Sequence, residues 1–449
     1  MMRGRFWARC NLTLVVASFA ACWASEHVHA ENWPGWRGPA RNGLSNETGL
    51  PVSWSEKQGV HWRVALPGSG ISNPIVWGER VFVTSSDGRN QDELHLICLA
   101  RDDGSEKWHL RLWGSAPTLY HPTKSSMASP SPVTDGEHIF AFYGSGDVVC
   151  VDFDGGLVWQ RSLASEYGPF ENRFAASSSP LLYRDLLVLQ CDHYGPSYLL
   201  AIDKATGANR WKADRPDVWL SWSSPQLTPP ATGKAEGELP VASPKRARVP
   251  TTTVAPAITD VRDELLVCGS HRLDAYDPTT GEKLWTVGGL SRECVPTPVF
   301  GHGLIFATTG PNGQTVCVRP GGKGDVTDSH VVWSNPRGSP FVPSPVLVGD
   351  RLYLVDDKGV GTCLDARSGR LAWRKRFGGA FTASPVAGDG KAYFCDESGQ
   401  TIVVATDTDK YRELARNQLG EAIFASPAIS QSRLFIRTAT HLYCLGVRP

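Results

Sequence analysis

The sequence lacks several features that would point to other classes of protein. Its 449 residues carry a formal net charge of zero, and phosphate binding needs a basic surface, so a nucleic-acid partner is not expected. After residue 30, no apolar run approaches the length of a transmembrane helix. No segment shows a helical periodicity of useful length. We therefore expect no transmembrane segment and a fold that is not built on helices.

The cysteines lack the spacings of common sites. There is no Cys-x-x-Cys, no Cys-x-x-Cys-His and no adjacent pair of cysteines, so neither a zinc site nor c-type haem is indicated. A position that accepts either Ala or Cys requires a small buried side chain. Five cysteines recur at one such position of a repeat, where Ala201 and Ala275 stand in other copies: Cys98, Cys150, Cys317, Cys363 and Cys444. We expect free, buried thiols, because equivalent positions in different repeats are too far apart to be bridged.

Residues 1–30 have the pattern of a cleaved signal peptide. Arg3, Arg5 and Arg9 precede an apolar stretch at 12–24, and the segment ends in small residues at Ala30. We expect cleavage after Ala30 and export to the periplasm or cell envelope. The alternative is a lipoprotein signal, in which Cys22 carries the lipid and anchors the protein peripherally to a membrane.

What the sequence does contain is a repeated phrase, Gly-x-x-x-Trp. It occurs five times, at 104–108, 155–159, 207–211, 281–285 and 369–373, and most copies follow a small residue and an Asp. Self-similarity at a spacing of about 40 to 50 residues indicates a stacked or radial repeat. We interpret the Trp residues as packing between repeats, and the Asp residues at 152, 203, 277 and 365 as acceptors for turn amides.

Each repeat reads as four short antiparallel strands. Eight copies open with Ser, Thr or Asn before Pro, and Pro is tolerated at the start of a strand. Runs of alternating apolar and polar residues follow, as at 80–83 and 351–354. The last copy has no Trp strand, whereas an isolated Trp strand surrounds Trp62. Pairing the two predicts an all-β, eight-bladed propeller over residues 59–449, closed by the strand around Trp62 and preceded by a strap at 31–58.

One segment breaks this rhythm. Residues 226–255 are rich in Pro, Thr, Ala and Lys and contain no aromatic residue. This composition predicts a flexible loop inserted into the fourth blade. The loop is either a tolerated surface insertion or a docking site for a partner.

The repeated phrase resembles that of the pyrroloquinoline-quinone-like (PQQ-like) β-propeller family, with its tryptophan-docking motif. This superfamily includes quinoprotein dehydrogenases and the outer-membrane assembly lipoprotein BamB. The N-terminal phrase at 33–39, Trp-Pro-Gly-Trp-Arg-Gly-Pro, is similar to that of exported single-domain members. Family quinoproteins hold the quinone and a calcium ion at the ring axis, commonly beside adjacent half-cystines, and ligate calcium with Glu, Asn and Asp. Because this chain lacks adjacent cysteines and a compact acidic motif, we expect neither PQQ nor calcium.

Residues outside the repeat pattern gather at the entries to the innermost strands, which should face the axial funnel. They are His121, Lys124, Arg173, Trp219, Trp222, Arg292, Glu293, Phe341, Phe381 and Phe424. These side chains either form a site for a small polar ligand or a peptide, or plug the channel, with Glu293 facing Arg173 or Arg292.

Two His-containing pairs, Asp192-His193 and Ser270-His271, each follow a second strand. Such pairs support acid–base chemistry only beside a nucleophile or a metal, and turn geometry explains them equally well. We expect no catalytic residues and no metal site. The sequence favours an exported, non-catalytic, protein-binding or scaffold propeller of the cell envelope. The alternatives are a PQQ-dependent dehydrogenase or other enzyme with its site in the funnel, and a BamB-like assembly lipoprotein.

Overall fold

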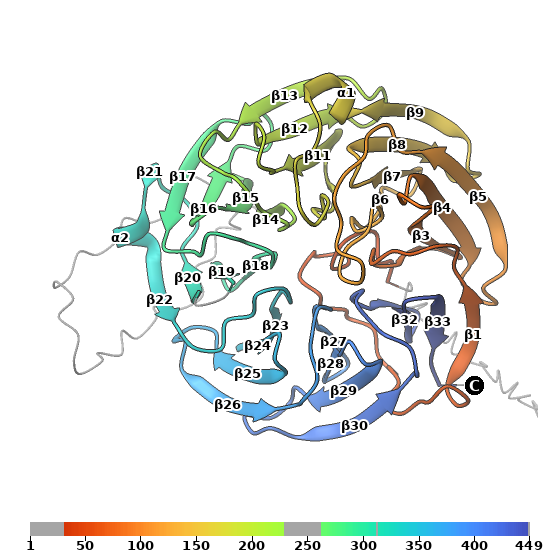
Figure 1. Ribbon diagram of the computed structural model, residues 1–449. Helices are drawn as coiled ribbons and strands as arrows, with labels where there is room; N and C mark the ends of the chain where they lie inside the picture. Colours follow the sequence, from red (N-terminus) through yellow and green to blue (C-terminus); the bar gives the residue numbers. More distant parts are fainter. Residues whose placement is uncertain (1–30, 229–261, 311–312, 448–449) are drawn as a thin grey trace, which may run out of the picture.

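The computed structural model describes residues 31–228, 262–310 and 313–447. Its strands form eight separate sheets arranged around a central axis (Figure 1). Each sheet is one blade, and a strand of two or three residues lies nearest the axis. The expected all-β, eight-bladed propeller is confirmed. The expected signal peptide, with Cys22, lies outside the described residues.

The first four blades follow one another along the chain. Blade one contains β2 (Ile75–Trp77), β3 (Arg80–Asp87), β4 (Glu93–Ala100) and β5 (Glu106–Trp113). Blade two contains β6 (Val133–Thr134), β7 (His138–Phe142), β8 (Asp147–Asp152) and β9 (Leu157–Ser162), followed by helix α1 (Leu163–Tyr167). Blade three contains β10 (Leu181–Tyr183), β11 (Leu186–Cys191), β12 (Tyr198–Asp203) and β13 (Asn209–Asp214). Blade four contains β14 (Gln226–Thr228), β15 (Glu264–Gly269), β16 (Arg272–Tyr276) and β17 (Lys283–Gly288), with β21 (Gly324–Asp325) as a parallel fifth strand.

The remaining blades complete the circle. Blade five contains β18 (Val299–Gly301), β19 (Leu304–Thr308), β20 (Thr315–Val318) and β22 (Val331–Asn335), with helix α2 (Thr327–His330). Blade six contains β23 (Val346–Val348), β24 (Arg351–Val355), β25 (Val360–Asp365) and β26 (Leu371–Arg376). Blade seven contains β27 (Val386–Gly388), β28 (Lys391–Cys395), β29 (Gln400–Ala405) and β30 (Glu413–Gln418). Blade eight contains β31 (Ala428–Ser430), β32 (Arg433–Arg437), β33 (His441–Leu445) and β1 (Val60–Ala65).

The ring closes as the sequence predicts. Strand β1 pairs antiparallel with β33, and Trp62 stands opposite Cys444. The N-terminal strand therefore supplies the outer edge of blade eight, which removes an open sheet edge at the seam.

The Gly-x-x-x-Trp phrase forms the contact between neighbouring blades at five of the eight junctions. A Cβ placed on Gly155 would meet the indole of Trp108 from the preceding blade at 2.8 Å, so only Gly allows the indole to lie this close. The indole N–H of each Trp then donates to a backbone carbonyl of that next blade, at 2.7–3.1 Å. The pairs are Trp62–Arg101, Trp108–Phe153, Trp159–Lys204, Trp211–Pro278 and Trp333–Ala366.

Two tryptophans depart from this pattern, and both precede a blade that lacks the Gly. Trp285 precedes blade five and donates instead to Glu264 of its own blade at 2.9 Å. Trp373 precedes blade seven, and its buried indole N–H has no hydrogen-bond partner among the described residues. The outer strand of blade seven, β30, contains no Trp, so the contact is also absent between blades seven and eight.

Two other expectations from the repeat are confirmed. Cysteines 98, 150, 191, 268, 294, 317, 363, 395 and 444 are free and buried. The repeat Asp residues accept turn amides: Asp203 Oδ1, for example, accepts from the backbone N–H of Ala205 and of Thr206.

The inserted segment begins later than its composition indicates. Gln226–Thr228 form β14, the innermost strand of blade four, and pair with β15. Gln226 and Thr228 are buried despite their polarity. Their burial on the same side of the strand explains why residues 226–228 belong to the sheet and not to the inserted loop. Residues 229–255 of the expected loop lie outside the described residues.

The strap at 31–58 crosses one face of the ring. Trp33 bridges to Val76 of blade one, Arg37 donates to the Pro345 carbonyl of blade six, and Leu44 bridges to Ala387 of blade seven. We call this the strap face. Strands alternate in direction within a blade, so the loops that lead into the innermost strands lie on the opposite face, which we call the entry face. Among the described residues, no helix is long and apolar enough to cross a membrane.

Candidate functional site

A closed circle of hydrogen bonds surrounds the axis at the start of the innermost strands. In each blade, the backbone N–H of the residue before Pro donates to the side-chain oxygen of its counterpart in the next blade, at 2.8–3.3 Å. The last bond runs from Ser426 back to Asn73 and closes the circle. We call these residues the collar: Asn73, Ser131, Ser179, Ser224, Thr297, Ser344, Ser384 and Ser426.

The collar explains why these positions are Ser, Thr or Asn. An N–H at the start of a buried strand needs an acceptor, and all eight side chains are at most 4% exposed. The sequence contains the signal, eight small polar residues before Pro, but this pattern alone predicts only the start of a strand. The circular connection becomes visible only when the blades are placed around one axis.

A cavity of about 210 Å³ lies along the axis and is lined by most of the collar. Its walls are mainly apolar, with Ile71, Phe174, Val295 and Val342 among them. Trp36 of the strap lines both this cavity and a smaller one on the strap side, and its indole N–H donates to Thr297 Oγ1 at 2.9 Å. The strap therefore closes one end of the axial channel.

Four of the ten residues expected in the funnel line this cavity: Lys124, Trp222, Phe341 and Phe424. The Lys124 ammonium pairs with Glu397 at 2.8 Å. Trp222 donates its indole N–H to the Ala175 carbonyl at 3.0 Å, which fixes the ring.

The other six lie around or away from the cavity. Arg173 pairs with Glu293 at 2.5 Å, one of the two pairings expected, and His121 lies 5.9 Å from the ring of Phe174. The Arg292 guanidinium stacks over Trp219 at 5.3 Å. Phe381 is not among the lining residues. It is 1% exposed and packs on Phe377 in the core between blades six and seven, because its apolar ring is better buried there than in a channel.

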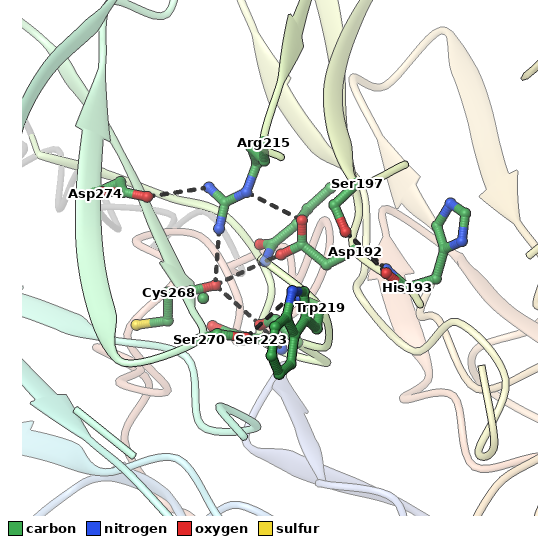
Figure 2. Close-up of polar contacts among 12 residues, drawn as sticks. Asp192, His193, Ser197, Arg215, Trp219, Ser223, Cys268, Ser270 and Asp274 are labelled. Atoms are coloured by element: carbon green, nitrogen blue, oxygen red, sulfur yellow. Dashed lines mark hydrogen bonds and ion pairs between the residues drawn. The ribbon is translucent and has the colours of Figure 1, made fainter. Parts of the chain in front are cut away.

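A buried charge cluster lies at the start of the loop that carries Trp219 (Figure 2). The side chains of Arg215, Asp192 and Asp274 are fully buried, with Arg215 Nε 3.0 Å from Asp192 and Nη1 3.8 Å from Asp274. The Nε–Oδ1 contact is an ion pair without hydrogen-bond geometry. The cluster joins β13, the turn after β11 and strand β16, and so fixes the start of the loop at 215–224.

The electrostatics of the cluster favour a charged guanidinium. Burial alone would lower the pKa of Arg215, but the neighbouring carboxylates raise it above its usual value. Burial raises the pKa of Asp192 and Arg215 opposes that rise. For Asp274, the cations Arg215, Lys283 and Arg272 outweigh burial and lower the pKa.

The same loop is fixed at further points. The Trp219 backbone N–H donates to Ser270 Oγ at 3.1 Å, Ser221 Oγ donates to the carbonyls of Cys268 and Cys294, and the Trp222 N–H donates to the Cys294 carbonyl. The Trp219 side chain nevertheless stays 53% exposed on the entry face. Two more exposed apolar side chains, Leu119 and Tyr194, lie on neighbouring loops of that face.

The two His-containing pairs do not form an acid–base site. The Asp192 carboxylate forms an ion pair with Arg215. The prediction that Asp192 is a simple turn residue is therefore corrected. His193 is buried and stacks on Phe170 at 5.1 Å, and its Nδ1 accepts the Gly195 N–H at 3.1 Å. Burial lowers the pKa of His193. His271 is a turn residue with a φ of 68°, as turn geometry predicts.

The lining of the axial cavity does not fit a calcium ion with a quinone. Calcium takes six to eight oxygen ligands with carboxylates prominent among them, whereas the described residues that line the cavity include no Asp or Glu. Over the same described part of the chain, no three His, Cys, Asp or Glu side chains are grouped to hold a metal.

Comparisons with known proteins agree with the fold. BamB from Moraxella catarrhalis has 13% sequence identity and a TM-score of 0.57, over 86% of this chain and 96% of that one. Quinohemoprotein alcohol dehydrogenase from Comamonas testosteroni has 11% identity and a TM-score of 0.63, over 93% and 81%. The computationally designed Ika8 protein has 10% identity and a TM-score of 0.57, over 87% and 100%. At these identities the likeness establishes the fold alone.

No curated protein matches the sequence significantly. It does match the pattern of one family, described as "Outer membrane protein assembly factor BamB", over residues 44–221 and 269–439. These two stretches cover most of the chain and include all eight blades in full or in part. The chain therefore belongs to the BamB family of PQQ-like β-propellers.

Proposed function

We propose that this protein is an exported, protein-binding propeller that acts in the periplasm or at the cell envelope and docks its partner on the entry face. The observation that carries the proposal is Trp219, an exposed indole on a loop whose backbone donates hydrogen bonds to Ser270 and Cys294. The family description, an outer-membrane protein assembly factor, supports a partner that is itself a protein.

Rigidity is what separates Trp219 from an ordinary exposed side chain. Binding to a mobile loop loses affinity to the entropy of ordering it. Here the Arg215 cluster and the bonds to Ser270 order the loop before any partner arrives. Large aromatic side chains in such positions frequently dominate the binding energy of an interface.

The charges around Trp219 indicate the chemistry of the partner. The Arg292 guanidinium lies over the indole, and in the described part of the chain it has no carboxylate partner. Arg173 nearby is already paired with Glu293. We therefore expect the partner to present an apolar side chain flanked by an acidic residue, so that one covers Trp219 and the other pairs with Arg292.

The test is site-specific photo-crosslinking in cell envelopes, with the photoreactive residue at position 219, 119 or 371. Leu371 is the matched control, because it is an exposed leucine like Leu119 but lies on the outer strand of blade six. We expect one partner to crosslink from 219 and 119 and not from 371. We expect Arg292→Glu to abolish the product. Equal crosslinking from all three positions, or no dependence on Arg292, contradicts the proposal.

We also infer that this action needs no resident cofactor. The support is the chemistry of the axial cavity, which offers hydroxyls, one ammonium and one amide but no carboxylate. Titration with PQQ and calcium provides the test, and a saturable, stoichiometric spectral change that Trp222→Ala removes would favour the quinoprotein dehydrogenase instead. Mass spectrometry of the mature N-terminus decides between a form that begins at Glu31 and one lipidated at Cys22.

A further inference from the structure

The axial cavity has hydrogen-bond donors that the protein itself does not use. The collar serines accept an N–H from the preceding blade, and this leaves the hydroxyl hydrogen free to donate. Within the described residues, no acceptor receives the hydroxyl hydrogens of Ser179, Ser224, Ser344, Ser384 and Ser426, all of which line the cavity.

Asn73 supplies a further unused donor. Its Oδ1 accepts the Ser426 N–H at 3.1 Å, and this fixes which end of the amide is the NH₂ group. The residue is 1% exposed, lines the cavity, and its Nδ2 has no partner among the described residues. A buried amide N–H that bonds to nothing is unfavourable, because it has lost its hydrogen bonds to water and gained none in the protein. An oxygen-bearing occupant of the cavity would remove this penalty.

The other walls favour a ring with apolar faces. Trp222, Phe341 and Phe424 line the cavity from three different entry loops, and Trp36 closes the strap end. Aromatic rings carry negative charge on their faces and attract the weakly positive C–H bonds of a saturated ring. An occupant should therefore combine C–H faces with oxygens at its edge.

Charge and size narrow the class of ligand further. Lys124 is the one charged side chain among the described lining residues, and Glu397 already neutralises it. Drug-sized ligands occupy pockets of about 300–1,000 Å³, so a cavity of about 210 Å³ has room for a single ring. We propose that the axial cavity binds a neutral, ring-shaped polyhydroxyl molecule, a monosaccharide or a cyclic polyol, through the collar hydroxyls and Asn73.

The experiment is calorimetric titration of the purified protein with glucose, galactose, mannose, N-acetylglucosamine and myo-inositol, with glucuronate and glucosamine as charged comparators. We expect saturable one-to-one binding of at least one neutral compound. Asn73→Ser removes the free amide but keeps a collar acceptor of the type found in other blades, and we expect it to raise Kd about tenfold.

A matched pair of variants separates ligand contact from collar integrity. Ser384→Ala deletes the acceptor of the Ser344 N–H and Ser131→Ala deletes the acceptor of the Asn73 N–H, but of the two only Ser384 lines the cavity. We expect Ser384→Ala to raise Kd about tenfold and Ser131→Ala to change it less than about twofold, with folding of both checked by circular dichroism.

Three results would overturn the proposal: no neutral compound binds, a charged comparator binds more tightly in a manner that Lys124→Met abolishes, or both serine variants weaken binding equally. The proposal rests on different residues from partner docking. Trp219→Ala should leave the sugar affinity unchanged, so failure of one proposal is distinguishable from failure of the other.

Discussion

Trp333 of blade five lies directly against Gly369 of blade six. A Cβ placed on Gly369 would stand 2.6 Å from Cδ2 of the indole, and the indole N–H donates to the Ala366 carbonyl at 2.9 Å. The same relationship recurs at four other junctions, at Gly104, Gly155, Gly207 and Gly281, so it can be tested at any of these five. Gly369 is the most useful position because the chain contains a glycine with the same backbone conformation and no neighbour.

Gly369→Ala should destabilise the fold much more than Gly390→Ala. The two glycines have φ values of 68° and 69°, but nothing lies within 4 Å of a Cβ at Gly390. Both variants therefore suffer the backbone strain of about 1 kcal/mol, and only Gly369→Ala adds overpacking of about 1–3 kcal/mol against Trp333. Urea unfolding followed by tryptophan fluorescence measures both. Equal losses would mean that the indole contact contributes nothing.

Trp333→Phe should cost more than Trp373→Phe, because only the first removes an indole hydrogen bond. Trp333 donates to Ala366, whereas the Trp373 N–H has no partner among the described residues. Each variant loses a similar ring volume, so the difference isolates the hydrogen bond, about 1–2 kcal/mol in the free energy of unfolding. The measurement is chemical denaturation of both variants. A larger loss for Trp373→Phe contradicts the assignment.

Acid should weaken the seam between blades seven and eight through Glu421. Partial burial of this carboxylate would by itself raise its pKa. Hydrogen bonds from Thr438, Thr440 and His441 outweigh the effect of burial and lower the pKa to about 2. A lowered carboxyl pKa stabilises the fold above the unfolded value of 4.5, and this stabilisation disappears as the pH falls from 4.5 towards 2.

The matching variant is Glu421→Gln. This variant should lose about 1 kcal/mol of stability at neutral pH. The loss is smaller than the shift of the Glu421 pKa implies, because the side chain remains 22% exposed and water screens its contacts. The difference between wild type and variant should shrink as the pH falls through this window. Thermal unfolding at a series of pH values measures it, and a difference that stays constant down to pH 2 would contradict the assignment.

Arg215→Met should be strongly destabilising. It leaves Asp192 buried without its cation, and breaking a buried pair in this way costs about 3–5 kcal/mol. Asp274 keeps Arg272 and Lys283, so adding Asp192→Asn should restore much of the loss. Arg272→Met, which removes a more exposed partner, is the control and should cost about 1 kcal/mol. Urea unfolding of the four proteins decides the point, and failure of Asp192→Asn to rescue would show that the buried charge is not the cause.

The sequence predicted the architecture well because the repeat is a local pattern. Gly369 and Trp373 are four residues apart. The strand around Trp62 belongs to no blade of its own, and only the last blade lacks the outer strand that it can supply. The contacts that build the candidate site are not local. Ser426 reaches Asn73 across the closed ring, and Asp192 meets Arg215 only after β12 and β13 have formed.

The errors have physical causes of the same kind. Phe381 has the composition of a funnel residue, yet Phe377 and its neighbours offer it an apolar pocket. Gln226 opens a polar segment, yet pairing with Leu266 draws it into a sheet. Sequence composition describes what a residue prefers on average, and the three-dimensional neighbours decide what it does.

The pairing of β1 with β33 sets the order of events during synthesis. Strand β1 is synthesised before the strands of blade one, and its partner at 441–445 follows only after all strands of the other seven blades. Until then, the strap also lacks its contacts with Pro345 and Ala387. Contacts so far apart in sequence form slowly and leave a strand edge exposed meanwhile. A ribosome that stalls before blade eight would therefore release an open, aggregation-prone arc instead of a smaller propeller.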